Sequence, residues 1–169
     1  MKTLISFLLL VSFGGLCSCE LISNNEPKTE LEKLPPITQE GKNTFGYLVN
    51  GEAIVVRNTM NITAIYQQDN LQLGGGVKNS DKDLDITIFP PYSQLEEFVS
   101  YDITKAAMYY NFYEGCYYEL ENTYEGYIRF SKIDRINYII SGTFEFSTVT
   151  ANCDTVRITD GRFDVQYTP

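Results

Sequence analysis

From Thr44 onward, apolar and polar residues alternate along the chain with a period of two. Successive side chains of a β-strand point to opposite faces, so this period is typical of a sheet with one face in a core and the other in water. The clearest stretch covers residues 137–147, where one face would carry Tyr138, Ile140, Gly142, Phe144 and Phe146. Roughly nine or ten such short strands favour an all-β fold, a single antiparallel β-sandwich or barrel-like domain over residues 44–169.

Turn signals separate the predicted strands. Asn50–Gly51 stands between two β-prone runs and predicts a hairpin, because both residues tolerate a positive φ. Asp160–Gly161 stands where the apolar parity reverses, and either a tight turn or a glycine bulge within one long strand would reset it. Residues 93–100 could form two turns of helix, and no window predicts a long helix.

The first residues have the form of a bacterial lipoprotein signal. One lysine precedes the apolar run Leu4–Phe13, which at about ten residues is too short to span a bilayer. Leu16–Cys17–Ser18–Cys19 resembles a lipobox, in which residues 1–18 are removed and Cys19 is lipidated. The alternatives are an ordinary secreted protein or, less favoured, a C-x-C metal site, which would lack further cysteine or histidine ligands nearby. Residues 19–43 are polar and proline-containing, and we expect a flexible tether there.

The net charge bears on which partners the protein can bind, and the cysteine content bears on the redox state of its compartment. The chain has 13 Lys and Arg against 22 Asp and Glu, a formal charge of −9. Nucleic-acid affinity depends on cations at phosphates, so we expect no nucleic-acid partner. Cys116 and Cys153 are left after Cys17 and Cys19 are assigned. In an oxidising compartment they can form a disulfide worth about 3–4 kcal/mol, and the alternative is two half-buried thiols.

The sequence gives little evidence for catalytic or metal-binding groups. The chain has no histidine, so neither a Ser-His nor a Cys-His arrangement can form. The acidic residues are too scattered for two to be selected as a glycosidase pair. Residues 79–85 carry acidic side chains at alternate positions, as a calcium-binding loop could. Because Lys82 interrupts this pattern, a solvated turn is favoured over a calcium loop. We therefore predict a protein that is not an enzyme and that uses no cofactor or metal.

An aromatic stretch over residues 106–130 carries more than half of the 13 tyrosines. In strand alternation Tyr109 and Tyr113 share one face, and we predict that these two rings, with Tyr117, stack on a sugar or a peptide. The opposing interpretation is that both faces are covered, or that exposed tyrosine simply suits a strand. Separately, the triplet beginning at Asp154 resembles the short O-glycosylation acceptor of Bacteroidota, which would make Thr155 the modified residue.

Both ends of the domain resemble a family of small Bacteroidota cell-envelope lipoproteins of unknown function. The similar segments are LEKLPPITQEGKNTFGYLVNGEAIVV (31–56), IISGTFEFSTV (139–149) and DTVRITDGRFDV (154–165). The resemblance implies an outer-membrane lipoprotein. Because the function of the family is unknown, it assigns no catalytic or binding residues to this chain. Residues 20–23 lack a dense acidic run of the kind expected for surface export, so the periplasmic and the surface side both stay open.

Two functions follow from these expectations. The first is a non-enzymatic binding module, held at the membrane by its N-terminal lipid, for a glycan, a peptide or an envelope protein. The second is a structural or accessory subunit whose exposed strands pair with an outer-membrane protein complex.

Overall fold

The structure is a computed structural model that describes residues 27–68, 70–90 and 94–169. The predicted signal peptide, Cys17 and the predicted lipidation site Cys19 lie outside these residues.

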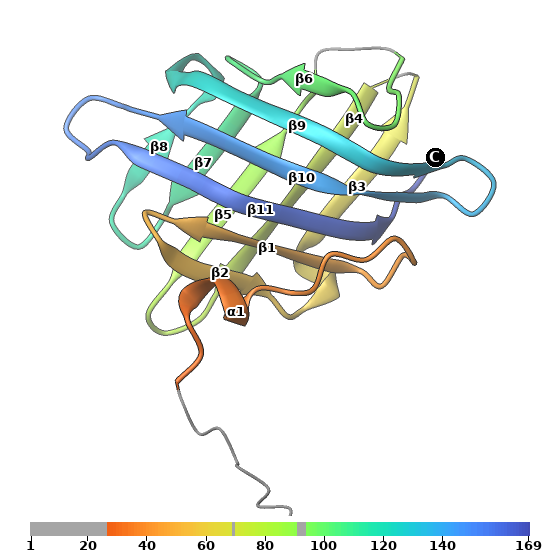
Figure 1. Ribbon diagram of the computed structural model, residues 1–169. Helices are drawn as coiled ribbons and strands as arrows, with labels where there is room; N and C mark the ends of the chain where they lie inside the picture. Colours follow the sequence, from red (N-terminus) through yellow and green to blue (C-terminus); the bar gives the residue numbers. More distant parts are fainter. Residues whose placement is uncertain (1–26, 69, 91–93) are drawn as a thin grey trace, which may run out of the picture.

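Two antiparallel sheets pack face to face and confirm the all-β prediction (Figure 1). The first sheet has six strands in the order β2-β1-β11-β10-β9-β6, and the second has five in the order β3-β4-β5-β7-β8. The strands of the first sheet are β1 (Thr44–Val49), β2 (Glu52–Val56), β6 (Ser100–Asp102), β9 (Thr123–Asp134), β10 (Ile139–Thr148) and β11 (Val156–Gln166). Those of the second are β3 (Ile62–Gln67), β4 (Asn70–Lys78), β5 (Asp83–Ile88), β7 (Ala107–Asn111) and β8 (Cys116–Tyr118).

Helical structure is limited to single turns in the described residues. They are α1 (Glu30–Lys33) and the 3₁₀ turns η1 (Thr59–Asn61) and η2 (Leu120–Asn122). Thr29 caps α1, and its hydroxyl accepts a hydrogen bond from the Glu32 amide. Residues 94–99 form a loop with turns, so the helix expected over 93–100 is absent from the part of that segment that is described.

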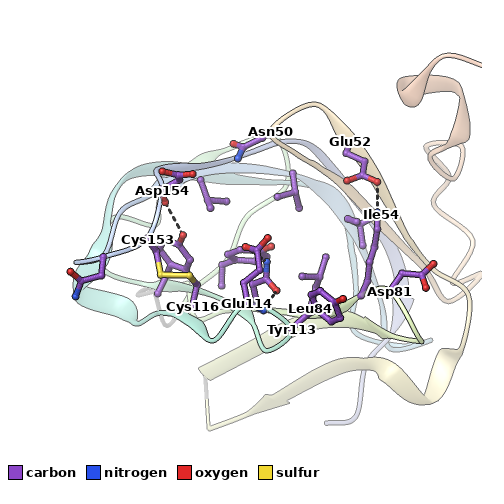
Figure 2. A pocket seen from close by; sticks show the side chains of 17 residues that line it. Asn50, Glu52, Ile54, Asp81, Leu84, Tyr113, Glu114, Cys116, Cys153 and Asp154 are labelled. Atoms are coloured by element: carbon purple, nitrogen blue, oxygen red, sulfur yellow. Dashed lines mark hydrogen bonds and ion pairs between the residues drawn. A yellow bond between two sulfur atoms is a disulfide. The ribbon is translucent and has the colours of Figure 1, made fainter.

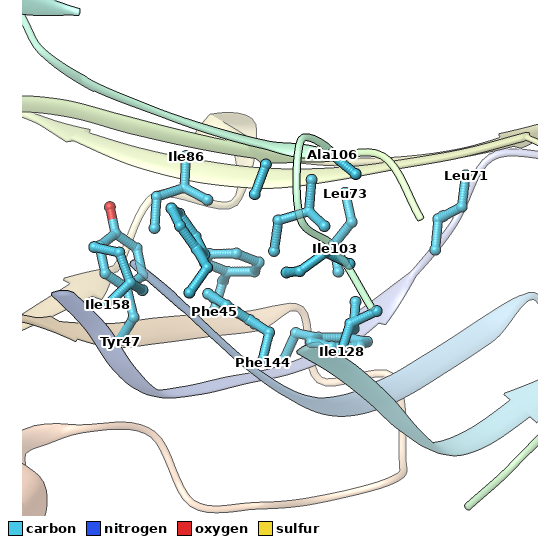
Figure 3. Packing of buried hydrophobic residues seen from close by; sticks show 14 of the residues in the cluster. Phe45, Tyr47, Leu71, Leu73, Ile86, Ile103, Ala106, Ile128, Phe144 and Ile158 are labelled. Atoms are coloured by element: carbon cyan, nitrogen blue, oxygen red, sulfur yellow. The ribbon is translucent and has the colours of Figure 1, made fainter. Parts of the chain in front are cut away.

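The predicted alternation becomes the division between core and surface. In β10, Ile140, Phe144 and Phe146 point into the core between the sheets. Figure 3 shows how Phe45 and Phe144 from the first sheet meet Leu73 and Ile86 from the second. The rings of Phe45 and Phe144 lie 5.4 Å apart, within the usual range for a favourable aromatic pair.

The two glycine-containing turn signals have different outcomes. Asn50 and Gly51 have φ values of 49° and 89° and connect β1 to β2, as predicted for a hairpin. Asp160–Gly161 lies inside the continuous strand β11, where the register shifts against both β10 and β1. The prediction of a glycine bulge within one long strand is therefore confirmed, and the alternative of a tight turn is wrong. Asp160 adopts φ 52°, and Gly161 approaches Phe144 so closely that a Cβ would lie 2.5 Å from its carbonyl oxygen.

The segment before β1 contacts the first sheet from Glu30 onward, because the Glu30 carboxylate accepts a hydrogen bond from the Ala53 amide of β2. Leu34 is buried, and the Thr38 hydroxyl and the amides of residues 40–42 donate to the Asp164 carboxylate on the outer face of β11. Ser141 on β10 donates to the same carboxylate at 2.7 Å. These contacts are at odds with a free tether over residues 30–43, because a polar segment can be fixed by hydrogen bonds to carboxylates without burying much apolar surface.

Neighbouring segments cover parts of two of the four sheet edges. Beside β3, the Tyr66 amide donates to the Thr168 carbonyl at 2.8 Å, and the Thr168 amide donates to Ala64 at 2.9 Å. Beside β2, the Ala53 amide donates to the Glu30 carboxylate at 2.9 Å. The other two edge strands, β6 and β8, have three residues each.

Candidate binding cavity

A cavity of about 660 Å³ opens between the two sheets at one end of the sandwich (Figure 2). Four chain segments form its rim: the hairpin at Asn50, the turn at Asp81–Lys82, the hairpin at Tyr113–Glu114 and the loop at Asn152–Asp154. The apolar side chains in the wall are Val49, Ile54, Leu84 and Val156. The cavity thus combines an apolar interior with a polar rim, which is the usual character of a ligand site.

The predicted disulfide is present and forms one wall of this cavity. Cys116 and Cys153 are joined at an S–S distance of 2.07 Å, across a sequence separation of 37. The bond links β8 of the second sheet to the loop between β10 and β11 of the first. Next to it, the Tyr118 hydroxyl donates to the Asp154 carbonyl at 2.7 Å. Together the two bonds hold both sides of the cavity in place.

Tyr109 lies at the inner wall of the cavity, and its predicted role as an outward-facing stacking ring is wrong. Its side chain is only 2% exposed, and its ring lies 5.5 Å from that of Tyr118. In register, Tyr109 aligns with Ile86 of β5, which is fully buried, so the pairing of β7 with β5 turns it inward. Burial raises the pKa of Tyr109, and the nearby Tyr118, Glu114 and Glu52 raise it further.

The Tyr109 hydroxyl has no hydrogen-bond partner among the described residues. Among the described residues, the fully enclosed side-chain polar atoms without a partner are Ser131 Oγ and Thr148 Oγ1, so the Tyr109 hydroxyl is not fully enclosed. The hydroxyl therefore reaches the cavity surface. Buried polar groups are nearly always paired, so an unpaired phenol at a cavity wall is a place where a bound group can donate or accept.

Acidic side chains dominate the cavity rim. Glu52, Asp81, Glu114 and Asp154 surround it, and Lys82 is the one basic residue in its lining. Figure 2 shows the four carboxyl groups distributed around the opening. Lys82 is paired with Glu52. Asp81, Glu114 and Asp154 have no ion pair within the described part of the chain. The rim therefore carries a local excess of negative charge.

A cluster of three rings lies on the outer face of the second sheet, and we call it the aromatic triad: Tyr110, Phe112 and Tyr117. Their centroids lie 5.6–5.9 Å apart. Phe112 is 45% exposed and Tyr117 49% exposed, so the prediction that Tyr117 is an exposed ring is confirmed. Tyr110 and Phe112 belong to the strand face that was expected to point away from the surface patch, so the sequence reasoning missed them.

Asp85 lies beside the triad, aligned in register between Gly76 and Tyr110. Burial raises its pKa above the ordinary value for aspartate. Burial also raises the pKa of Tyr110 to about 12, helped by the hydroxyl's 2.9 Å hydrogen bond to Glu119. The triad thus has both apolar rings and hydrogen-bonding groups at its edge.

The other predicted sites fall in different places. Tyr113 is 68% exposed at the cavity rim, apart from Tyr117 on the outer face. Thr155 is exposed beside the cavity loop, and its glycosylation stays a prediction. Residues 79–82 form the turn between β4 and β5, where Asn79 Oδ1 accepts from the Asp81 and Lys82 amides. This is the solvated turn that was favoured over a calcium loop.

Neither a metal-binding group nor a membrane-spanning helix occurs in the described residues. Over 27–68, 70–90 and 94–169, no three His, Cys, Asp or Glu side chains come together in a way that could hold a metal ion. The helices in the same ranges are too short and too polar to cross a bilayer.

The cavity's acidic residues were not predicted as a group, because they are far apart in sequence. Glu52 and Asp154 are separated by most of the domain and reach the same rim only because β1 pairs with both β2 and β11 in the first sheet. The one available signal was their position beside other features: Glu114 stands two residues before Cys116, and Asp154 follows Cys153. A disulfide between these cysteines necessarily brings the two carboxylates to one region.

Comparison with known proteins adds no relative: no protein-family model, curated protein or solved structure matches this chain.

Proposed function

We propose that this protein is a lipid-anchored envelope protein whose β-sandwich is a non-enzymatic binding module, with the end cavity as its ligand site. The binding role rests mainly on the Tyr109 hydroxyl in the wall of the cavity, which has no hydrogen-bond partner among the residues that the structure describes. A volume of about 660 Å³ is within the range of typical small-molecule sites, roughly 300–1,000 Å³. It is also enough for one side chain of a peptide.

Two chemical features support binding over catalysis. The chain contains no histidine to act as a general base near neutral pH. Both cysteines at the cavity are oxidised to a disulfide, and a nucleophilic cysteine must be a free thiolate.

The binding role is tested by a ligand screen on the full chain, purified from membranes in detergent. Thermal-shift measurements against panels of glycans, peptides and small molecules should find a stabilising ligand. The Tyr109→Phe variant should lose most of that stabilisation, because it removes only the hydroxyl and keeps the ring. A ligand that stabilises both forms equally would place binding elsewhere, and a panel with no ligand would contradict the proposal.

The anchor is tested by mass spectrometry of the N-terminus, with the two cysteines as a matched pair. Cys19→Ser should abolish acylation and release the protein from the membrane. Cys17→Ser should leave both unchanged, because Cys17 is expected to leave with the signal. Three acyl chains contribute on the order of 30 kcal/mol to insertion, so an unmodified and freely soluble wild type would contradict the anchor.

The aromatic triad favours a second binding role, in which its exposed rings stack on a sugar. Tyr and Phe rings present apolar faces to sugar C–H groups, and the tyrosine hydroxyls and Asp85 can hydrogen-bond to sugar hydroxyls. On a glycan array, replacing Phe112 and Tyr117 with Ser should abolish glycan binding. Tyr124→Ser is the control, because Tyr124 is a similarly exposed ring on β9 of the other sheet. Intact binding in the triad variant would reject this role.

Strand pairing with an outer-membrane complex receives less support from the sheet edges. Thr168 already hydrogen-bonds to the edge of β3, and Glu30 accepts from the edge of β2. The remaining edge strands, β6 and β8, offer three residues each. Affinity in strand addition comes from main-chain hydrogen bonds, so such short edges provide little of it.

A further inference from the structure

The cavity's lining points to one class of ligand, and this inference rests on the proposed function of the cavity as a binding site. We infer that the cavity binds an alkylammonium group, supplied either by a lysyl side chain of a polypeptide or by a free amine. The charge of the rim, the unpaired phenol and the apolar wall each match one part of such a group.

The rim selects for positive charge. Asp81, Glu114 and Asp154 have no cationic partner in the described residues, whereas the only basic group in the lining, Lys82, is held by Glu52. Like charges gathered around an opening attract a counter-ion and repel anions. The same field acts on the phenols, since Glu114 raises the pKa of both Tyr109 and Tyr118, and Asp154 raises that of Tyr118 as well.

The inner wall provides the remaining contacts. The Tyr109 hydroxyl oxygen is free to accept a hydrogen bond from an ammonium, and its ring pairs with Tyr118 at the same wall. Tyrosine faces also attract cations directly. Ile54, Leu84 and Val156 offer an apolar surface to the alkyl chain that would carry the charge. A hydrated metal ion would not use these aliphatic side chains, and an alkylammonium would.

The test compares three probes of matched size and different charge on the full chain in detergent. They are n-pentylammonium, 1-pentanol and pentanoate, titrated while the tyrosine NMR signals are recorded. We expect pentylammonium to shift the signals of Tyr109 and Tyr113 at millimolar concentration, and the other two probes to bind at least about tenfold more weakly. Raising the salt concentration should weaken pentylammonium binding, because the rim carboxylates are exposed and screened.

Charge-neutralising variants locate the binding. Replacing Glu114 with Gln and Asp154 with Asn should together lower the affinity about tenfold, because both changes keep the shape and remove the charge. Glu125→Gln is the matched control, since Glu125 is exposed on β9 outside the cavity. Tyr109→Phe should also weaken binding without loss of stability, because its hydroxyl has no partner to lose among the described residues.

Two further arms distinguish the source of the group. A short peptide with one lysine should bind more tightly than pentylammonium if the ligand is a polypeptide, and acetylation of that lysine should abolish binding. Binding of free amines alone indicates a small-molecule ligand. Either result supports the inference that the cavity binds an alkylammonium group.

Failure of the inference and failure of the proposed function give different results. If 1-pentanol binds as well as pentylammonium and Tyr109→Phe weakens both, the cavity is a site and the preference for a cation is wrong. If no probe shifts the Tyr109 signals, the inference is overturned. The proposed function falls with it only if the wider ligand screen also finds nothing that depends on Tyr109.

Discussion

At the scale of single residues, the Asp164 carboxylate is the group that fixes the N-terminal segment. It accepts hydrogen bonds from Thr38, Ser141 and the amides of residues 40–42, at 2.5–3.3 Å. The side chain is 1% exposed although it points away from the core of the sandwich. Burial alone would raise its pKa, but these donors hold the pKa down to about 2. The Asp164 carboxylate thus fixes residues 38–42 on the first sheet mainly through hydrogen bonds.

Replacing Asp164 with Asn should destabilise the domain by roughly 2–3 kcal/mol, because hydrogen bonds to a charged group are the strong ones and an amide nitrogen would face donors. Urea unfolding measures this loss. Asp154→Asn is the control and should change stability by less than about 0.5 kcal/mol, since its side chain is exposed. Equal effects of the two changes would contradict the role given to Asp164.

Acid should weaken the same contact. The pKa of Asp164 is about 2 in the folded protein, below the ordinary 3.8, so the charged form is favoured by folding. Its contribution is fully present above about pH 4 and is lost as the pH falls through 2. We expect the loss of stability from this group to be roughly 2 kcal/mol, because each unit of pKa difference between the folded and unfolded states corresponds to about 1.4 kcal/mol. Measured from pH 5 to pH 2, the stability of Asp164→Asn should fall less steeply than that of the wild type, and parallel curves would reject this.

At the scale of elements, β11 shows how a strand changes its inward face without ending. Val156 and Ile158 point inward before the bulge, and Phe163 and Val165 point inward after it. The two parities differ by one position, which the bulge at residues 159–161 absorbs. The strand therefore contributes to the core along its whole length, and it lies between β1 and β10 in the first sheet.

The bulge depends on the left-handed backbone of Asp160, whose φ is 52°. Asp160→Gly should be neutral or stabilise the domain by up to about 1 kcal/mol, because glycine adopts this conformation without strain. Asp160→Val should destabilise it by roughly 1–2 kcal/mol, because a β-branched residue resists a positive φ. Thermal unfolding of the two variants gives the comparison, and equal melting temperatures would mean that the bulge does not constrain this residue.

At the scale of the whole molecule, the disulfide connects two sheets that otherwise meet mainly through side chains. Cys116 lies on β8, an edge strand of three residues with few hydrogen bonds of its own, and Cys153 lies in the loop after β10. The bond therefore joins weakly held parts of both sheets at the mouth of the cavity. We expect it to control the shape of the ligand site as well as stability.

Replacing both cysteines with Ala should lower the free energy of unfolding by about 3–4 kcal/mol, the value that the chain-entropy model gives for a loop of this length. Reducing the wild type with dithiothreitol should lower its urea midpoint as much as the double substitution does. The double variant is the control and should not respond to the reductant. An unchanged midpoint in both experiments would show that the bond adds nothing to the folded state.

Local patterning was sufficient for much of the fold. The period-two alternation predicts strands and groups their residues into two faces, because the direction of a side chain in a strand depends only on its position in the chain. For Phe144 and Phe146 the inward face was also evident, since the opposite face of β10 carries Ser, Thr and Glu. The hairpin at Asn50–Gly51 followed from the backbone preferences of two residues.

Where both faces of a strand were apolar, only the tertiary structure decided which one is buried. Tyr109 and Tyr110 are equivalent by pattern, and Tyr109 turns inward because β7 pairs with β5 and aligns it with Ile86. The cavity depends even more on contacts between distant residues, since its carboxylates come from four separate chain segments. The sequence by itself thus determined the strands and the composition of their faces, through interactions between near neighbours. Sheet pairing and packing determined the burial of Tyr109 and the acidic rim, because these depend on contacts between residues far apart in the chain.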